Sequence, residues 1–231
     1  MKILISCPEC IALNYESNAA TLTLGNGSVY KATCERGHEQ AVSLPHQKHE
    51  ILFEFGVYAI IDGYYREAIS SFAAALERYY EYFLRVVTLG EYSEESFENA
   101  WKQVSSQSER QLGGYIFSHL IMCGRPPNLL SNSLITLRNR AIHKGYIPSK
   151  EEAMQYGDGV SKLIIEGVSQ LHRRYGDKMR EITRQTLYPD GVSVSDRIHI
   201  HETYLRGLAE RDPDCFYDYV SSIRTHNQPR Y

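Results

Sequence analysis

The clearest helical signal in the chain lies at residues 64–87, which read YYREAISSFAAALERYYEYFLRVV. At about 100° per residue, its apolar side chains fall in one arc and its charged side chains lie opposite. The apolar set is Tyr65, Ile69, Phe72, Ala75, Leu76, Tyr79, Phe83 and Val87, and the charged set is Glu67, Arg78, Glu81 and Arg85. The segment therefore predicts a long amphipathic helix, which Gly90 ends.

Similar patterns before and after this segment predict a mainly α-helical fold. Further helices are expected at residues 49–62, 93–106, 109–123, 130–144 and 149–175. One shared core is expected to contain Phe72, Leu76, Phe83, Leu134, Leu137 and Ala141. Beyond residue 177 the pattern weakens, and it indicates only a short strand near 192–200 and a helix start at Asp212 and Pro213.

Residues 1 to about 40 have a different character and read as strands and turns. Two apolar segments, 22–24 and 29–32, flank Gly-Asn-Gly-Ser at 25–28, which is a strong hairpin signal. The small size of this segment leaves it little apolar core. It therefore needs another source of stability.

Two short cysteine and histidine motifs lie on either side of the hairpin. They are Cys7-x2-Cys10 and Cys34-x3-His38. Zinc binds four nitrogen or sulfur ligands tetrahedrally, and two such turns supply them in this order. Four protein ligands leave no open coordination position, so a zinc ion here would be structural and would provide most of the segment's folding free energy.

The fourth ligand is the least constrained by the sequence, since His46 and His49 follow closely. Three reduced cysteines in a small β segment are the alternative to a metal site. With zinc, residues 1–45 form a zinc ribbon in front of a helical domain at 46–231 with a C-terminal extension.

Composition limits the classes of function. Hydrophobic residues make up 42% and charged residues 23% of the 231, as in globular proteins. No apolar run is long enough for a membrane span, and the start is too short for a signal peptide, so we expect a cytoplasmic protein whose cysteines are thiols or metal ligands. The net charge of −3 argues against a general nucleic-acid coat, so any contact with RNA must be local.

Arg138 is an unusual residue in the expected helix at 130–144. On a helical wheel it falls inside the arc of Leu134, Leu137 and Ala141, whereas Arg140 and Lys144 point to solvent. A buried guanidinium needs a carboxylate, carbonyl groups, a phosphate or a wet cleft.

Glu77 is one candidate partner, because it lies at the edge of its own helix's apolar arc. From there it could pair with Arg138 or orient His143. A solvated charge on the flank of the helix is the alternative for Glu77.

Arg138, Asn139 and His143 form an Arg-x4-His motif with Asn directly after the Arg, on a late helix of an expected α-bundle. This motif resembles the signature of the HEPN superfamily, and residues 63–77 look like its long first helices. The similarity spans roughly residues 50–175.

The resemblance implies a metal-independent endoribonuclease that acts as a homodimer, often as a toxin or an anti-phage defence effector with an antitoxin or regulatory partner. Arg138 and His143 would be catalytic, with Asn139 and Glu77 in support. Histidine can transfer protons near neutral pH, and arginine can neutralise the charge that grows on a phosphate. Two alternatives remain open: a non-catalytic HEPN module that binds a nucleotide or a partner, and a structural or antitoxin-like interaction protein.

Overall fold

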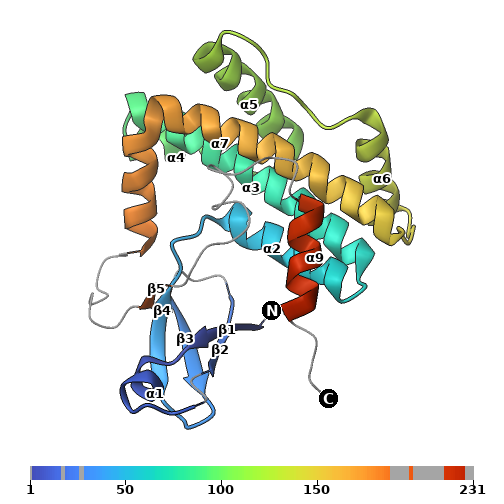
Figure 1. The fold of residues 1–231 in the computed structure, drawn as a ribbon. Coiled ribbons are helices and arrows are strands. Elements are labelled where there is room, and N and C mark those ends of the chain that lie inside the picture. The colour runs from blue at the N-terminus through green and yellow to red at the C-terminus, as the bar shows by residue number, and fades with distance from the viewer. Residues whose placement is uncertain (1, 17–18, 26–28, 188–197, 200–215, 227–231) are drawn as a thin grey trace. The chain divides into compact units, whose positions relative to one another are not determined.

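The structure, a computed structural model, describes residues 2–16, 19–25, 29–187, 198–199 and 216–226. It is mainly helical, with a small N-terminal sheet (Figure 1). The chain forms two compact units. The first contains Met1–His46 and Arg180–Glu202, and the second contains Gln47–Met179 and Thr203–Tyr231. The two units are called the sheet unit and the helical unit below.

The sheet unit contains one sheet with the strand order β1-β2-β3-β4-β5. Its strands are β1 (Lys2–Ser6), β2 (Ala19–Thr23), β3 (Val29–Cys34), β4 (Glu39–Ser43) and β5 (Ile198–His199). The first four pair antiparallel in sequence order, and β5 pairs parallel to β4. The β2–β3 pair confirms the predicted hairpin strands, while β1 and β4 complete a sheet of which the sequence signalled only the middle.

The alternation of side chains in β3 positions the first residue of the second cysteine and histidine motif. Tyr30, Ala32 and Cys34 are buried, whereas Lys31 and Thr33 are exposed. This period of two is that of a strand with one face on a core. Cys34, the last residue of β3, is therefore turned toward the interior of the unit.

Seven helices are described outside the sheet region, and they confirm the predicted mainly α-helical fold. They are α2 (Lys48–Ile61), α3 (Tyr65–Glu91), α4 (Glu94–Trp101), α5 (Ser108–Cys123), α6 (Asn132–His143), α7 (Lys150–Leu187) and α9 (Phe216–His226). Residues of α7 up to Met179 belong to the helical unit. The helix α4 is shorter than predicted.

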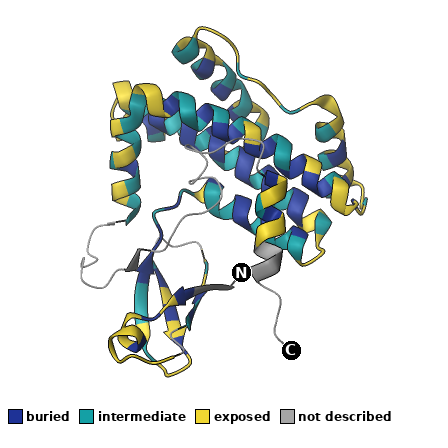
Figure 2. Ribbon diagram, in the orientation of Figure 1, coloured by how far each residue is buried: buried dark blue, intermediate teal, exposed yellow. Residues whose placement is uncertain are grey.

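The predicted core residues are buried with one exception. Leu134 is half-buried, and the buried members are Phe72, Leu76, Phe83, Leu137 and Ala141. The buried surface of α3 is wider than the predicted arc, because Tyr80, Tyr82 and Val86 are buried as well. Contacts of α3 with α2, α4, α5 and α6 explain this width, since several neighbours cover it (Figure 2).

Two glycines allow helices to approach the Phe72 ring closely. A Cβ on Gly157 of α7 would lie 2.8 Å and 2.9 Å from Phe72 Cε2 and Cζ. A Cβ on Gly56 of α2 would collide with the same ring. Real Cβ atoms essentially never come within 3.0 Å of such an atom, so these positions require glycine if the ring is to stay in place.

The predicted helix end near residue 175 coincides with a break inside α7. Helix α7 continues to Leu187, across a kink where Tyr175 has φ −126° and ψ 27°. The Tyr175 ring lies against Gly90 of α3, where a Cβ would collide with it, and its hydroxyl donates to Glu91 at 3.3 Å. These contacts hold the Tyr175 side chain at the kink, and the helical segment beyond it, up to Leu187, is the part that the sequence pattern did not indicate.

Of the features expected after residue 177, only part falls in the described residues. β5 overlaps the predicted strand near 192–200, whereas Asp212 and Pro213 lie outside the described residues. Among the described helices, none is long and apolar enough to cross a membrane.

Candidate functional site

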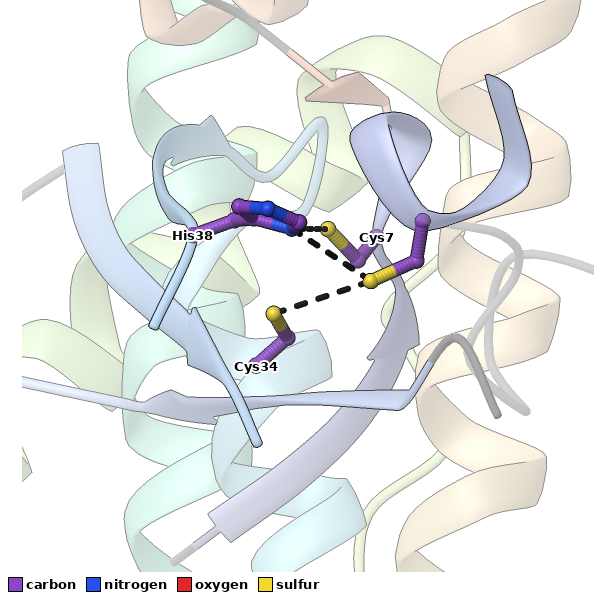
Figure 3. Close-up of side chains that lie close together, drawn as sticks. Cys7, Cys34 and His38 are labelled. Atoms are coloured by element: carbon purple, nitrogen blue, oxygen red, sulfur yellow. Dashed lines mark hydrogen bonds between the residues drawn. The ribbon is translucent and has the colours of Figure 1, made fainter. Parts of the chain in front are cut away.

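Four predicted ligands come together at one point of the sheet unit. The ligand atoms of Cys7, Cys10, Cys34 and His38 all lie within 4.8 Å of one another. Cys10 Sγ lies 3.8 Å from Cys34 Sγ, and His38 Nδ1 lies 3.6 Å from Cys7 Sγ and 3.4 Å from Cys10 Sγ (Figure 3). The four residues therefore form a cluster that can hold a metal ion.

Two tight turns produce this arrangement. Cys7 precedes the short helix α1 (Pro8–Ala12), and the backbone N–H of Ile11 donates to the Cys7 carbonyl at 3.0 Å. In the second turn, the Gly37 N–H donates to the Cys34 carbonyl at 3.0 Å, with a left-handed φ of 84° at Gly37. A residue with a side chain would be strained at that φ, so Gly37 allows the turn to bring His38 beside Cys34.

The three separations given above are close to those of a tetrahedral zinc site. With Zn–S bonds of about 2.3 Å and Zn–N bonds of about 2.0–2.1 Å, tetrahedral ligands lie about 3.8 Å apart for S–S and about 3.6 Å for S–N. The S–S separation of 3.8 Å is also far longer than the roughly 2.05 Å of a disulfide. The sulfur atoms are thus placed as ligands and not as a covalent pair.

Electrostatics in the cluster favour a cation. Burial, followed by the neighbouring Cys7 and Cys34 side chains, raises the pKa of Cys10 to about 12. Burial also acts to raise the pKa of Cys34, but hydrogen bonds from the backbone of Arg36 and His38 lower it to about 7. Several thiolates this close together need a positive charge among them, and a bound metal ion would supply it.

His38 is the histidine of the cluster. Its other ring nitrogen, Nε2, lies 3.6 Å from a Glu9 carboxylate oxygen, where a carboxylate can orient a metal-binding imidazole. The cluster contains neither His46 nor His49. His49 is buried in the helical unit against the rings of Tyr79 and Tyr82.

Arg138 of α6 is paired with a carboxylate on α3. Its Nη2 donates to Glu77 Oε1 at 3.2 Å, and its Nη1 donates to Asn139 Oδ1 at 3.0 Å. The Arg138 and Glu77 side chains are 28% and 34% exposed. The carboxylate partner that the helical wheel required is therefore present, and solvent still reaches the pair.

His143 is the last residue of α6 and is exposed. The helix stays regular from Arg138 to His143, so the two residues do not share a face; the chain leaves the helix at Lys144, before Gly145 with φ 67°. Arg66 Nε donates to the Ala141 carbonyl at 3.1 Å and so ties the end of α6 to the start of α3. The sequence pattern did not single out Arg66, because this contact joins residues 75 positions apart.

Arg140 is exposed, as predicted, but it is not simply solvated. Its guanidinium lies 3.7 Å from the centre of the Tyr146 ring. The Tyr146 hydroxyl donates to the Glu152 carboxylate at 3.0 Å, and Glu152 also closes the capping box of α7 with Ser149. A hydrogen bond from the Ser149 backbone is the main reason that the pKa of Glu152 is lowered. Together, these contacts among Arg140, Tyr146 and Glu152 hold the loop that follows His143 in place.

No protein-family model, curated protein or solved structure matches the chain.

Proposed function

We propose that the chain is a metal-independent endoribonuclease of the HEPN type, with Arg138 and His143 as its catalytic residues. The observation that carries this proposal is the position of Arg138, which a carboxylate and an amide orient at a surface that solvent reaches. The exposed His143 ends the same helix. Because the two residues do not share a face of α6, the last turn of the helix would have to loosen for the fixed positive charge and the proton-transfer group to meet one phosphate.

RNA supplies the nucleophile for the reaction. The His143 imidazole would take the proton of a 2′-hydroxyl, whose oxygen attacks the adjacent phosphorus. The bond from phosphorus to the 5′-oxygen breaks, and that oxygen takes a proton from water or from a second imidazole. The products are a 2′,3′-cyclic phosphate and a 5′-hydroxyl. The Arg138 guanidinium would donate hydrogen bonds to the phosphate oxygens as their negative charge grows.

Glu77 and Asn139 would position Arg138 in this scheme. Each accepts one hydrogen bond from it, and a guanidinium has five N–H donors in a rigid plane. Fixing the plane from one side leaves other donors to meet a phosphate. Both residues would therefore affect the rate through Arg138 and not through direct proton transfer.

The metal in the sheet unit would be a structural zinc ion. Three thiols and one imidazole form a donor set that zinc prefers, and the separations of 3.4 to 3.8 Å described above support it. Four protein ligands leave no position for a substrate or a reactive water. Zinc would stabilise the sheet unit and take no part in cleavage of RNA.

The HEPN resemblance further implies a homodimer and a role as a toxin or an anti-phage defence effector. Two Arg138–His143 pairs facing one groove would provide both the base and the acid of the reaction. An antitoxin or another regulatory protein would then control the activity in the cell.

One observation favours a second candidate function. Because Glu77 already pairs with Arg138, the positive charge of the guanidinium is partly neutralised before any phosphate arrives. A non-catalytic module that binds a nucleotide or a partner protein would tolerate this pair well.

Incubation of purified protein with total RNA distinguishes the two candidates. We expect wild type to cut RNA, and His143→Ala and Arg138→Ala to lower the rate by roughly a hundredfold or more. His172→Ala is the matched control, since His172 is an exposed histidine on α7. Wild-type protein that leaves RNA intact, or equal cutting by the His143→Ala form, would instead support the binding module.

A further inference from the structure

Helix α5 has an unusual surface. Residues 111–124 read QLGGYIFSHLIMCG and contain no Asp, Glu, Lys or Arg. Gln111, Tyr115 and His119 are buried on one side of the helix. On the other side Phe117 is 67% exposed and Ile121 80% exposed. A helix that faces water usually carries charged residues on its outer side, so this side is suited to a partner.

The exposed side forms one continuous strip, which we call the α5 apolar face. On a helical wheel its members fall within an arc of about 100°. It consists of Gly113, Phe117, Leu120, Ile121 and Gly124. A Cβ on Gly113 would have no atom within 4 Å, so the space above this residue, one turn before Phe117, is open and no side chain fills it.

The α5 apolar face is complementary to itself. A two-fold axis through Phe117, perpendicular to the helix, would place an antiparallel copy so that each residue 117−n faces residue 117+n. Ile121 would then occupy the open space at Gly113 of the other copy, and the two Phe117 rings would meet at the axis. Rows of residues four apart are the ridges by which helices commonly interlock.

Charges at the ends of α5 fit the same arrangement. Glu109 is exposed in the first turn, and Arg125 follows the last, so an antiparallel copy would bring each Glu109 opposite an Arg125. Arg125 is 54% exposed and already lies 2.8 Å from Glu166, so Glu109 would join an existing ion pair. The opposed helix dipoles also attract.

We propose that the α5 apolar face binds a second copy of this chain in an antiparallel, two-fold symmetric pair. A symmetric dimer requires that every projection on a surface has its counterpart on that same surface. Gly113 and Ile121, equally spaced from Phe117, meet this requirement. This proposal rests on the proposed function only for the expectation of a dimer, to which it adds a surface. A chain that dimerises through α5 and cuts no RNA would refute the proposed function alone, and a chain that cuts RNA without pairing through α5 would refute this interface alone.

The first test measures the mass of the full chain in solution across a range of concentrations. Wild type should have twice the mass of the 26.5 kDa chain at micromolar concentration. Ile121→Glu should raise the dimer dissociation constant at least about tenfold, as loss of a central apolar contact does. Ile147→Glu is the matched control, since Ile147 is 79% exposed and lies between α6 and α7.

The second test separates dimer contact from folding. Gly113→Leu adds a side chain where the single chain has open space, so the monomer should keep or gain thermal stability. In the dimer that side chain would collide with Ile121 of the other copy and weaken association. The double variant Gly113→Leu with Ile121→Ala exchanges large and small residues, and should recover at least part of the wild-type affinity.

A wild-type chain that stays monomeric at a hundred micromolar would overturn the proposal. So would a dimer with the same dissociation constant in the Ile121→Glu and Ile147→Glu forms. A Gly113→Leu form that dimerises as well as wild type would refute the predicted register.

Discussion

Replacing Gly157 with alanine should destabilise the helical unit. An added Cβ would lie 2.6 Å from Phe216 Cζ and within 2.9 Å of two atoms of the Phe72 ring. Both rings are fully buried, and each also packs against Phe53, so neither can retreat without displacing another ring. Overpacking of this kind costs about 1–3 kcal/mol, and glycine to alanine inside a helix gains about 1 kcal/mol. Because two immobile rings are affected, the overpacking cost should lie at the upper end of its range, about 3 kcal/mol, which leaves a net loss of about 2 kcal/mol.

Gly114→Ala provides the matched control for this change. It is also inside a helix, but its Cβ would meet Leu84 Cδ1 at 3.4 Å, which is close to an ordinary contact. Thermal unfolding followed by far-UV circular dichroism should place Gly157→Ala roughly 4–8 °C below wild type. Gly114→Ala should unfold at or above the wild-type temperature. A Gly157→Ala protein as stable as wild type would refute the close packing of α7 against α3 and α9.

Three further predictions follow from the two units. Protein purified without chelator should contain one zinc per chain, and Cys10→Ser should lose it while the helical circular dichroism stays nearly unchanged; clearly less zinc in wild type would count against the site. Leu137→Ala should cost about 2–5 kcal/mol of unfolding free energy in urea titrations, since Leu137 is 7% exposed, and a loss below about 0.5 kcal/mol would place it outside the core. Burial lowers the pKa of His49 to about 3, whereas an unfolded histidine titrates near 6.5. The unfolded chain therefore binds the proton more readily, and stability should fall as the pH drops from about 6.5 towards about 3. His49→Phe should flatten that part of the profile and the exposed control His172→Asn should not; equal profiles for wild type and His49→Phe would contradict the assignment.

The metal cluster could be predicted because its four ligands lie in two short sequence motifs. Two short motifs fix the turns, and a hairpin between them brings the ends together. Only the choice of histidine needed the structure, since His38, His46 and His49 all lie close in sequence. The pairing of Arg138 with Glu77 was predictable in part. A helical wheel shows that the Arg138 guanidinium needs a partner, but it does not identify which of the candidate groups that partner is.

Other features depend on contacts between distant residues, which no local pattern records. A second helical segment follows the break at Tyr175, whose ring lies against Gly90 of α3. Arg140 stacks on Tyr146 across the end of α6, where the sequence indicated only a solvated charge. The wide buried surface of α3 likewise follows from the number of helices around it.

The most direct test of the proposed activity compares two oligonucleotides of one sequence, one of RNA and one with 2′-O-methyl groups throughout. Wild-type protein in EDTA should cut only the RNA and leave 2′,3′-cyclic phosphate and 5′-hydroxyl ends, because the 2′-hydroxyl is the nucleophile. His143→Ala should cut it roughly a hundredfold more slowly or worse, and His172→Ala at the wild-type rate. Cleavage of the methylated strand, or an equal rate for His143→Ala and wild type, would contradict the roles proposed for Arg138 and His143.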